Sequence, residues 1–168
     1  DGAGTDASVV AGIEWAAAQG AHLISMSLGS PVPSIAMQEA IRHAVASGIF
    51  VICAAGNNGA DDSVEYPGHW SETIAVAAVD RHGRVAKFSS RGPEVAIAAP
   101  GEDVLSTYLD HGYAKLSSTS MATPFVTGVI ALMLAKHCKQ GGHTRIIHVG
   151  DLREHLARTA VDVSSLVT

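Results

Sequence analysis

Ser120 is the residue whose type and position are best suited to nucleophilic chemistry. It stands where a loop of Ser and Thr residues, 117–119, runs into the apolar segment 125–134, and the pattern predicts a helix over 120–137. Backbone N–H groups in the first turn of a helix lack partners and carry partial positive charge. They would stabilise an oxyanion beside the serine hydroxyl. Ser and Thr are also preferred helix caps, so this segment alone equally allows a purely structural interpretation.

Two further loops follow segments that are typical of buried strands. Asn57 comes after the apolar run 50–55, and residues 27–29 follow a strand predicted over 22–26. In an open parallel sheet, ligands bind beyond the carboxyl ends of the strands. A side-chain amide at such a place is a common oxyanion donor, although Asn and Gly residues also favour plain turns. In one parallel sheet the three loops would converge on one cleft.

Six short motifs are spread along the chain: Ser-Met-Ser-Leu-Gly at 25–29, Ala-Ala-Gly-Asn at 54–57, Tyr-Pro-Gly at 66–68, Phe-Ser-Ser-Arg-Gly-Pro at 88–93, Ala-Pro-Gly at 99–101 and Thr-Ser-Met-Ala-Thr-Pro at 119–124. In this order they resemble the subtilisin family of serine proteases, also called subtilases or peptidase S8. The similarity runs from about residue 1 to residue 137, with a looser tail. Each motif alone is moderately specific, but six in the family's order are hard to obtain by chance.

The resemblance implies roles for individual residues. Ser120 corresponds to the nucleophile, and Asn57 to the side-chain donor of the oxyanion hole, with the Ser120 N–H as second donor. The primary specificity pocket has two walls and a floor. The resemblance implies one wall from Ser27, Leu28 and Gly29 and the other from Ala54, Ala55 and Gly56. It implies Glu65 at the floor. A carboxylate at the floor would favour Lys or Arg at the cleaved residue. Glu65 fits a solvated acidic loop with Asp61 and Asp62 equally well.

The chain lacks the family's motifs for the base and its orienting carboxylate. A serine nucleophile needs both. The family carries them upstream in Asp-Thr/Ser-Gly and His-Gly-Thr-His segments, which do not occur here, and none of the nine histidines lies in a motif that marks a base. The resemblance therefore implies that residues 1–168 are the C-terminal part of a catalytic domain. We expect this part alone to be inactive, with base and carboxylate supplied from outside the chain.

Ser118 departs from the family pattern, which usually has glycine at this position. Glycine permits a closer approach of substrate and unusual backbone angles. The departure favours a second interpretation, a pseudoprotease or peptide-binding module that keeps the fold without cleaving. The retained Ser120 and Asn57 favour the enzyme.

The resemblance also implies calcium in the intact domain. Near Glu94, however, Ala96 stands where the family commonly has a carboxylate. We therefore assign no metal or other cofactor to this chain.

Helical and strand patterns alternate along the chain, which predicts an α/β fold. Helices are expected at 5–19, from 33–34 to 48, at 120–137 and at 151–159, and strands at 22–26, 49–54, 73–79, 84–88 and 95–99. With the resemblance, this predicts a three-layer subtilisin-like fold, a mostly parallel sheet flanked by helices, incomplete at its N-terminal side. The strand at 22–26 would then leave a sheet edge open. We expect that edge to pair with a missing N-terminal part or a second copy.

Composition limits the partners of the chain. The net charge is −5, aromatic residues make up 5%, and no basic run occurs, which argues against nucleic acid. No stretch reaches the ~18 consecutive apolar residues of a membrane span, and no signal peptide opens the sequence. The 47% of hydrophobic residues fits buried parallel strands. The remaining expectation is a polypeptide substrate, and the family resemblance implies a secreted protein.

Overall fold

The structure is a computed structural model that describes residues 4–139 and 148–162, with the side chains of 137–139 not described. Its centre is a four-stranded sheet in the order β1-β2-β3-β4, with every neighbouring pair parallel. The strands are β1 (Leu23–Met26), β2 (Phe50–Ala54), β3 (Ile74–Val79) and β4 (Val95–Pro100). Because the strands are parallel, their carboxyl ends, and the loops that follow them, lie along one edge of the sheet.

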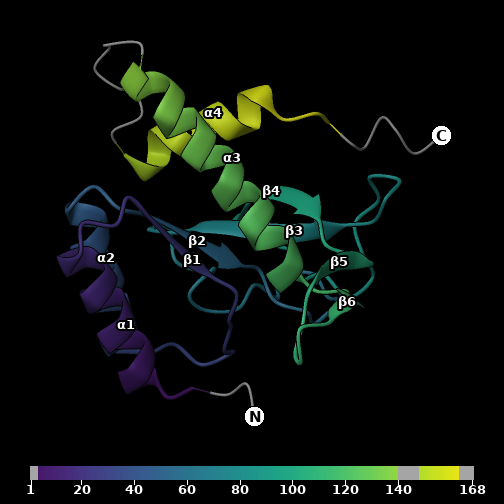
Figure 1. Cartoon of the computed structure of the whole chain (residues 1–168), viewed down its shortest axis with the longest axis horizontal. Helices are drawn as coiled ribbons and strands as arrows, with labels where there is room; N and C mark the ends of the chain where they lie inside the picture. Colours follow the sequence, from purple (N-terminus) through teal and green to yellow (C-terminus); the bar gives the residue numbers. More distant parts are fainter. Residues whose placement is uncertain (1–3, 140–147, 163–168) are drawn as a thin grey trace.

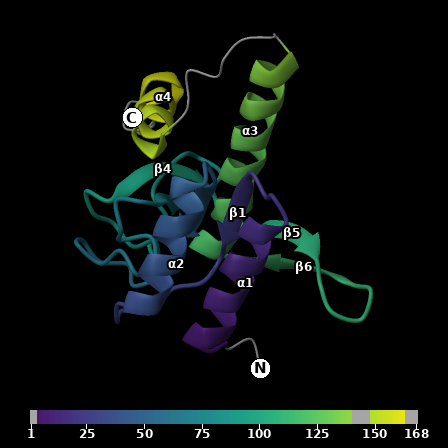
Figure 2. The same ribbon diagram turned by 90° about the vertical axis from the view of Figure 1, so that its left-hand side faces the viewer.

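Helices cover both faces of the sheet, so the fold has three layers (Figure 1). On one face, α1 (Asp6–Ala18) and α2 (Ile35–Ala46) lie side by side (Figure 2). The opposite face carries α3 (Thr119–Lys139) and α4 (Val149–Thr159). Successive β2 residues alternate between the layers, since Val51 packs with α2 and Ile52 packs with α3. Both faces are therefore buried, which explains the continuous apolar runs of these strands.

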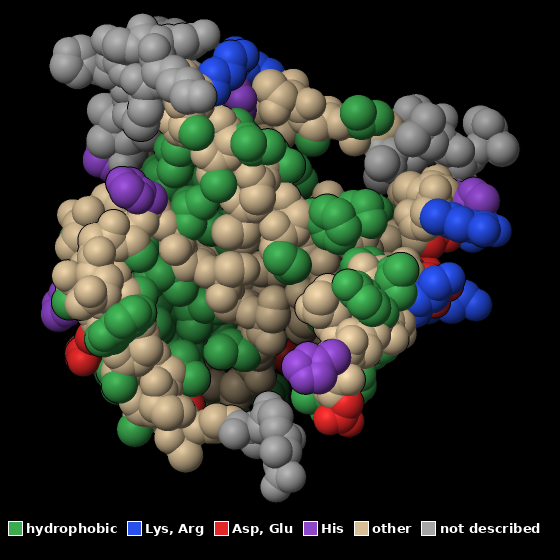
Figure 3. Space-filling view, viewed as in Figure 1, with side chains coloured by type: hydrophobic (Ala, Val, Ile, Leu, Met, Phe, Trp, Pro, Cys, Tyr) green, Lys and Arg blue, Asp and Glu red, His purple; other side chains and the backbone are tan. Residues whose placement is uncertain are grey.

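The long helix α3 is buried on one side and exposed on the other. Ile130 is fully buried against the sheet, whereas Val129 is 52% and Leu132 73% exposed. The sequence of this helix is apolar on nearly every face, which predicts a helix buried in the domain, and that prediction is wrong for this side. Figure 3 shows hydrophobic side chains gathered on this face of the molecule. Residues 119–136 also match a membrane span in length and composition, yet α3 packs on all four strands as the core helix of a domain does.

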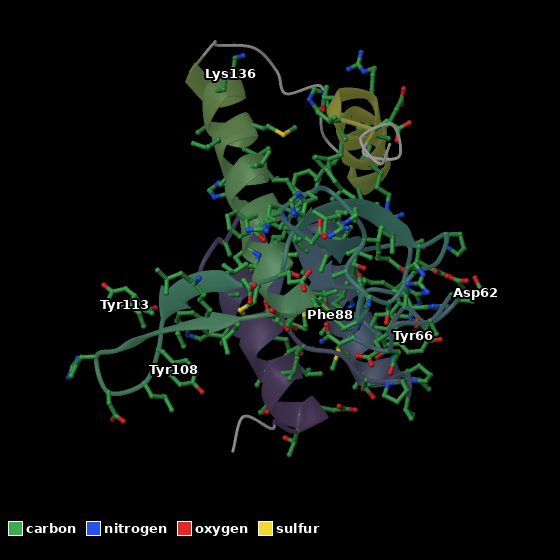
Figure 4. All side chains as sticks on the ribbon, turned by 90° about the vertical axis from the view of Figure 1, so that its right-hand side faces the viewer. Asp62, Tyr66, Phe88, Tyr108, Tyr113 and Lys136 are labelled. Carbon is green, nitrogen blue, oxygen red and sulfur yellow. The ribbon has the colours of Figure 1, made fainter. Side chains whose placement is uncertain are left out.

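Two segments differ from the expected elements. Residues 84–88 make only an isolated bridge, Val79 to Val85, instead of a strand. The carboxylate of Asp80 accepts hydrogen bonds from the N–H groups of His82 and Arg84, at 2.8 and 3.0 Å, and closes a tight turn there. The antiparallel hairpin of β5 (Val104–Thr107) and β6 (Tyr113–Leu116) was not expected. It projects from the body, where Figure 4 labels Tyr113, and its short, mostly exposed strands carry little apolar pattern.

The remaining helices and strands occur where the sequence predicts them, within a few residues at each end. The predicted α/β fold, a parallel sheet flanked by helices in three layers, is confirmed. Within the described residues, β1 has a strand neighbour on one side only. That edge and the loops after β1 and β2 surround Ser120 and Asn57.

Candidate active site

Ser120 lies in the first turn of α3 and is tied to the loop that follows β1. Its hydroxyl donates to the carbonyl oxygen of Ser27 at 3.4 Å, and the Ser27 hydroxyl donates to the carbonyl oxygen of Ser120 at 2.9 Å. This reciprocal pair joins residues that are 93 positions apart in the sequence. The fold thus brings the predicted nucleophile and the predicted first wall of the specificity pocket together.

Asn57 is held in one orientation by Thr119. The side-chain oxygen Oδ1 of Asn57 accepts from the Thr119 N–H at 2.9 Å and from the Thr119 hydroxyl at 3.2 Å. A backbone N–H can only donate, so the atom that faces it must be the amide oxygen, and Nδ2 must point the other way. Thr119 is itself fully buried, and its hydroxyl also accepts from the Gly56 N–H at 3.2 Å. The sequence alone did not indicate this positioning role for Thr119, although the residue opens the Thr-Ser-Met-Ala-Thr-Pro motif at 119–124.

The two predicted oxyanion donors converge on one oxygen atom. The Ser118 Oγ accepts from Asn57 Nδ2 at 3.0 Å and from the Ser120 N–H at 3.0 Å. Donors of an oxyanion hole must both lie 2.7–3.1 Å from the position of the developing charge. Here the Ser118 oxygen occupies a point that meets this condition for both donors. The arrangement can therefore hold a single negatively charged oxygen next to Ser120.

Glu65 extends between the two predicted pocket walls. A methyl group at Gly29 would overlap its carboxylate, and one at Gly56 would lie 2.9 Å from its Cγ. Its Oε1 accepts a hydrogen bond from Asn58 Nδ2 at 2.9 Å, and the side chain is half-buried. Asp61, by contrast, is exposed and pairs with Arg91 at 2.6 Å. Glu65 is thus separated from the solvated acidic loop and lies between the walls that contain Gly29 and Gly56.

Backbone pairing fixes the position of the Glu65 segment. Tyr66 and Ser30 exchange two hydrogen bonds of 2.9 Å each, which ties the loop after β1 to the loop after β2. The Glu65 N–H donates to the carbonyl oxygen of Ala55 at 2.9 Å. Ala54 and Ala55 are buried, so they frame the pocket through their backbone and present no exposed surface.

Small-ligand sites measure about 300–1,000 Å³. A cavity of about 540 Å³ adjoins these loops. Its lining includes Ser27, Leu28 and Gly29 from the loop after β1, together with Thr5 and Tyr66. Leu28 is partly exposed at this cavity. The predicted substrate-binding loop therefore lines a real hollow, and Ser27 connects it to Ser120, which is not itself among the lining residues.

No base is paired with Ser120 in the described part of the chain. Within residues 4–136 and 148–162, the Ser120 hydroxyl hydrogen-bonds only to the Ser27 carbonyl oxygen, and no histidine there is hydrogen-bonded to it. A competing nucleophile is also unsuitable, because burial raises the pKa of the Cys53 thiol to about 12, against a smaller opposing effect of a hydrogen bond with Thr73. Cys53 stays protonated at neutral pH and is unreactive.

The surroundings of Glu94 do not fit a calcium ion. Calcium takes six to eight oxygen ligands, mostly carboxylates and carbonyls. The carboxylate of Glu94 lies 3.6 Å from His69 Nδ1, and the Arg153 guanidinium donates to the Glu94 carbonyl oxygen at 3.4 Å. One carboxylate beside the His69 ring and the Arg153 guanidinium falls far short of that set of oxygen ligands. Within residues 4–136 and 148–162, no three His, Cys, Asp or Glu side chains gather into a metal site.

Comparison with known proteins agrees with this geometry. The chain matches the family model described as Subtilase family, Peptidase_S8, over residues 1–167. It is 42% identical over 165 residues to subtilisin DY of Bacillus licheniformis, covering 96% of this chain and 58% of that protein. It is 48% identical over 137 residues to a thermostable alkaline protease of Halalkalibacterium halodurans, covering 82% of this chain and 38% of that protein.

Solved structures give the same result. The self-cleaved protease domain of PatA matches with a TM-score of 0.85 and 32% identity, covering 96% of this chain and 62% of that one. The prenylagaramide maturation protease PagA matches with a TM-score of 0.83 and 29% identity, over 94% of this chain and 58% of that one. The chain spans less than two thirds of these relatives. The family match nevertheless extends over almost every residue, and the chain belongs to the subtilase family of serine proteases.

Proposed function

We propose that this chain is the nucleophile-bearing part of a serine endopeptidase that cleaves peptide bonds through an acyl-enzyme on Ser120. The observation that carries the proposal is the convergence of Asn57 Nδ2 and the Ser120 N–H on one oxygen position, 3.0 Å from each. Two donors arranged in this way stabilise the oxyanion of a tetrahedral intermediate. The cavity lined by residues 27–29 supplies the adjoining place for a polypeptide substrate.

In this mechanism the Ser120 Oγ attacks the carbonyl carbon of the scissile bond, and its proton passes to the general base. The carbonyl oxygen, now negative, receives the hydrogen bonds of Asn57 and of the Ser120 N–H. The C–N bond then breaks, and the base returns the proton to the departing amine. Water, deprotonated by the same base, hydrolyses the acyl-enzyme and restores the serine hydroxyl.

The base and its carboxylate come from outside this chain. We place their source at the outer edge of β1, which has no strand neighbour among the described residues, because such an edge presents N–H and C=O groups for another strand. The element that supplies them is a preceding part of the same protein, because a second copy of this chain would bring only the same histidines, none of which lies in a motif that marks a base. Such an element would place additional residues next to Ser27, which follows β1 and contacts Ser120.

Labelling with a fluorophosphonate probe tests this proposal, because the probe reacts only with an activated serine hydroxyl. We expect stoichiometric labelling of the full-length protein at Ser120, its loss in Ser120→Ala, and little or no labelling of the 168-residue chain alone. Labelling of the isolated chain as a monomer would show that the base lies within it. An unlabelled full-length protein would instead favour the non-catalytic, peptide-binding alternative. The Ser118 hydroxyl between the two donors supports that alternative.

The substrate preference follows from the position of Glu65. A half-buried carboxylate between Gly29 and Gly56 attracts a cationic side chain in the pocket, where water screens the charges less than at the surface. We expect Glu65→Gln to lower kcat/KM for substrates with Lys or Arg before the cleaved bond by about 10-fold, the size of a charge-assisted hydrogen bond. Substrates with Leu or Phe at that position should lose little. Equal turnover of basic and apolar substrates by the unmodified enzyme would contradict this preference.

A further inference from the structure

The Ser118 hydroxyl occupies the position that the substrate oxyanion requires. Its Oγ accepts one hydrogen bond from Asn57 Nδ2 and one from the Ser120 N–H, both 3.0 Å long. A hydroxyl oxygen has two lone pairs, so both are used by these donors. A substrate carbonyl oxygen cannot receive the same two N–H groups while the hydroxyl holds them. The two oxygens therefore compete for one site.

The backbone of Ser118 is anchored on both sides, so its side chain is the part that can move. The Ser118 N–H donates to the carbonyl oxygen of Gly101 at 2.8 Å, and the Ser118 carbonyl oxygen accepts from the Met121 N–H at 3.0 Å. Asn57 is likewise held by Thr119, at 2.9 Å. Rotation about the Cα–Cβ bond of Ser118 would take the hydroxyl away and leave both donors in place.

We propose, on the basis of the function proposed above, that Ser118 is an internal competitor for the oxyanion site, whose hydroxyl must rotate away before each acylation. The state seen here is then a self-blocked state with the donors already positioned. Release of the hydroxyl costs the hydrogen bonds that it makes, and this cost adds to the barrier of the chemical step. Ser118 acts as a positioning residue that lowers kcat and leaves substrate affinity largely unchanged.

A purely structural role for Ser118 makes the opposite prediction. Ser118 precedes α3, and its bond to the Ser120 N–H is also that of a helix cap. Loss of a cap alone would destabilise α3 and would leave kcat unchanged or lower. Loss of an internal competitor raises kcat. The direction of the change in kcat therefore separates the two roles.

The test compares Ser118→Ala with the unmodified full-length protein, using peptide substrates. We expect kcat to rise about fivefold, the value of one net hydrogen bond, with KM changed less than twofold. Ser118→Thr retains the hydroxyl and should behave like the unmodified enzyme. Ser117→Ala is the matched control, because it removes the neighbouring hydroxyl, which within the described part of the chain accepts from the Asp103 N–H at 3.0 Å and contacts neither Asn57 nor Ser120. An unchanged or lower kcat in Ser118→Ala, with the unmodified enzyme active, overturns the proposal.

Amide hydrogen exchange of the 168-residue chain supplies a readout that does not need turnover. If Ser118 holds the donor, the Ser120 N–H should exchange several-fold faster in Ser118→Ala, while Ser117→Ala leaves its rate unchanged. If neither the unmodified full-length protein nor its Ser118→Ala variant cleaves peptides, the proposed function fails. The exchange rates alone then decide whether the Ser118 hydroxyl occupies the oxyanion site. Equal Ser120 exchange rates in the unmodified chain and in Ser118→Ala overturn the inference.

Discussion

Replacement of Asn57 by alanine is expected to lower kcat of the full-length protease by about 10²- to 10³-fold, the range observed when the side-chain donor of this kind is removed from subtilisin itself. KM should change little, because the Asn57 amide stabilises charge that appears only in the transition state. The Nδ2 atom lies 3.0 Å from the oxygen position that it shares with the Ser120 N–H. One of the two donors would remain, so residual activity above background is expected.

Asn57→Asp makes this test sharper. Asn57 also accepts from the Thr119 N–H at 2.9 Å, so alanine removes a structural hydrogen bond together with the catalytic donor. Aspartate keeps an oxygen for Thr119 and loses the donor. We expect its kcat to fall at least as far as that of Asn57→Ala, while α3 stays in place. Gln19→Ala, which truncates an exposed amide at the end of α1, is the control and should leave kcat unchanged. A stable Asn57→Ala enzyme with kcat within threefold of the unmodified value would contradict the assigned role.

Replacement of Ile130 by alanine is expected to lower the free energy of unfolding by about 2–5 kcal/mol. Ile130 is fully buried in the layer between α3 and the sheet, in one cluster with Ile52, Ile74 and Val76. Removal of its outer carbons leaves a cavity that the rigid sheet cannot close. Urea unfolding of the 168-residue chain at low concentration, followed by circular dichroism, measures the change.

Leu132→Ala on the same helix is the matched control for Ile130. Its side chain is 73% exposed, so truncation should change the free energy of unfolding by less than about 0.5 kcal/mol. Equal losses for both variants would show that the outer face of α3 is also covered in solution. That outcome would contradict the assignment of Leu132 to the exposed side. Since α3 carries Ser120 in its first turn, the packing of Ile130 also keeps the nucleophile in position.

The parallel sheet and its helices could be predicted because their signals are local. Residues 50–54 form an unbroken apolar run, and a strand covered on both faces needs such a run. Ser34 precedes α2 and accepts from the Met37 N–H at 3.4 Å, as a helix cap should. The hairpin of β5 and β6 carries no comparable signal, since most of its residues are exposed and its pairing is made across a turn. Each of these two strands is stabilised by hydrogen bonds to the other strand, and the local sequence pattern of one strand does not indicate such a partner.

The amino-acid sequence by itself determined the chemical groups of this protein: Ser120 before an apolar helix, Asn57 after a buried strand, and the ordered motifs of the subtilase family. Side-chain type and neighbouring residues suffice for such assignments. Only the tertiary structure decided how those groups face one another. The contacts of Asn57 with Ser118 and of Ser27 with Ser120 join residues 61 and 93 positions apart. The position of the Ser118 hydroxyl between the two donors is likewise decided by the tertiary structure alone, because hydrogen bonding depends on geometry within a few tenths of an ångström.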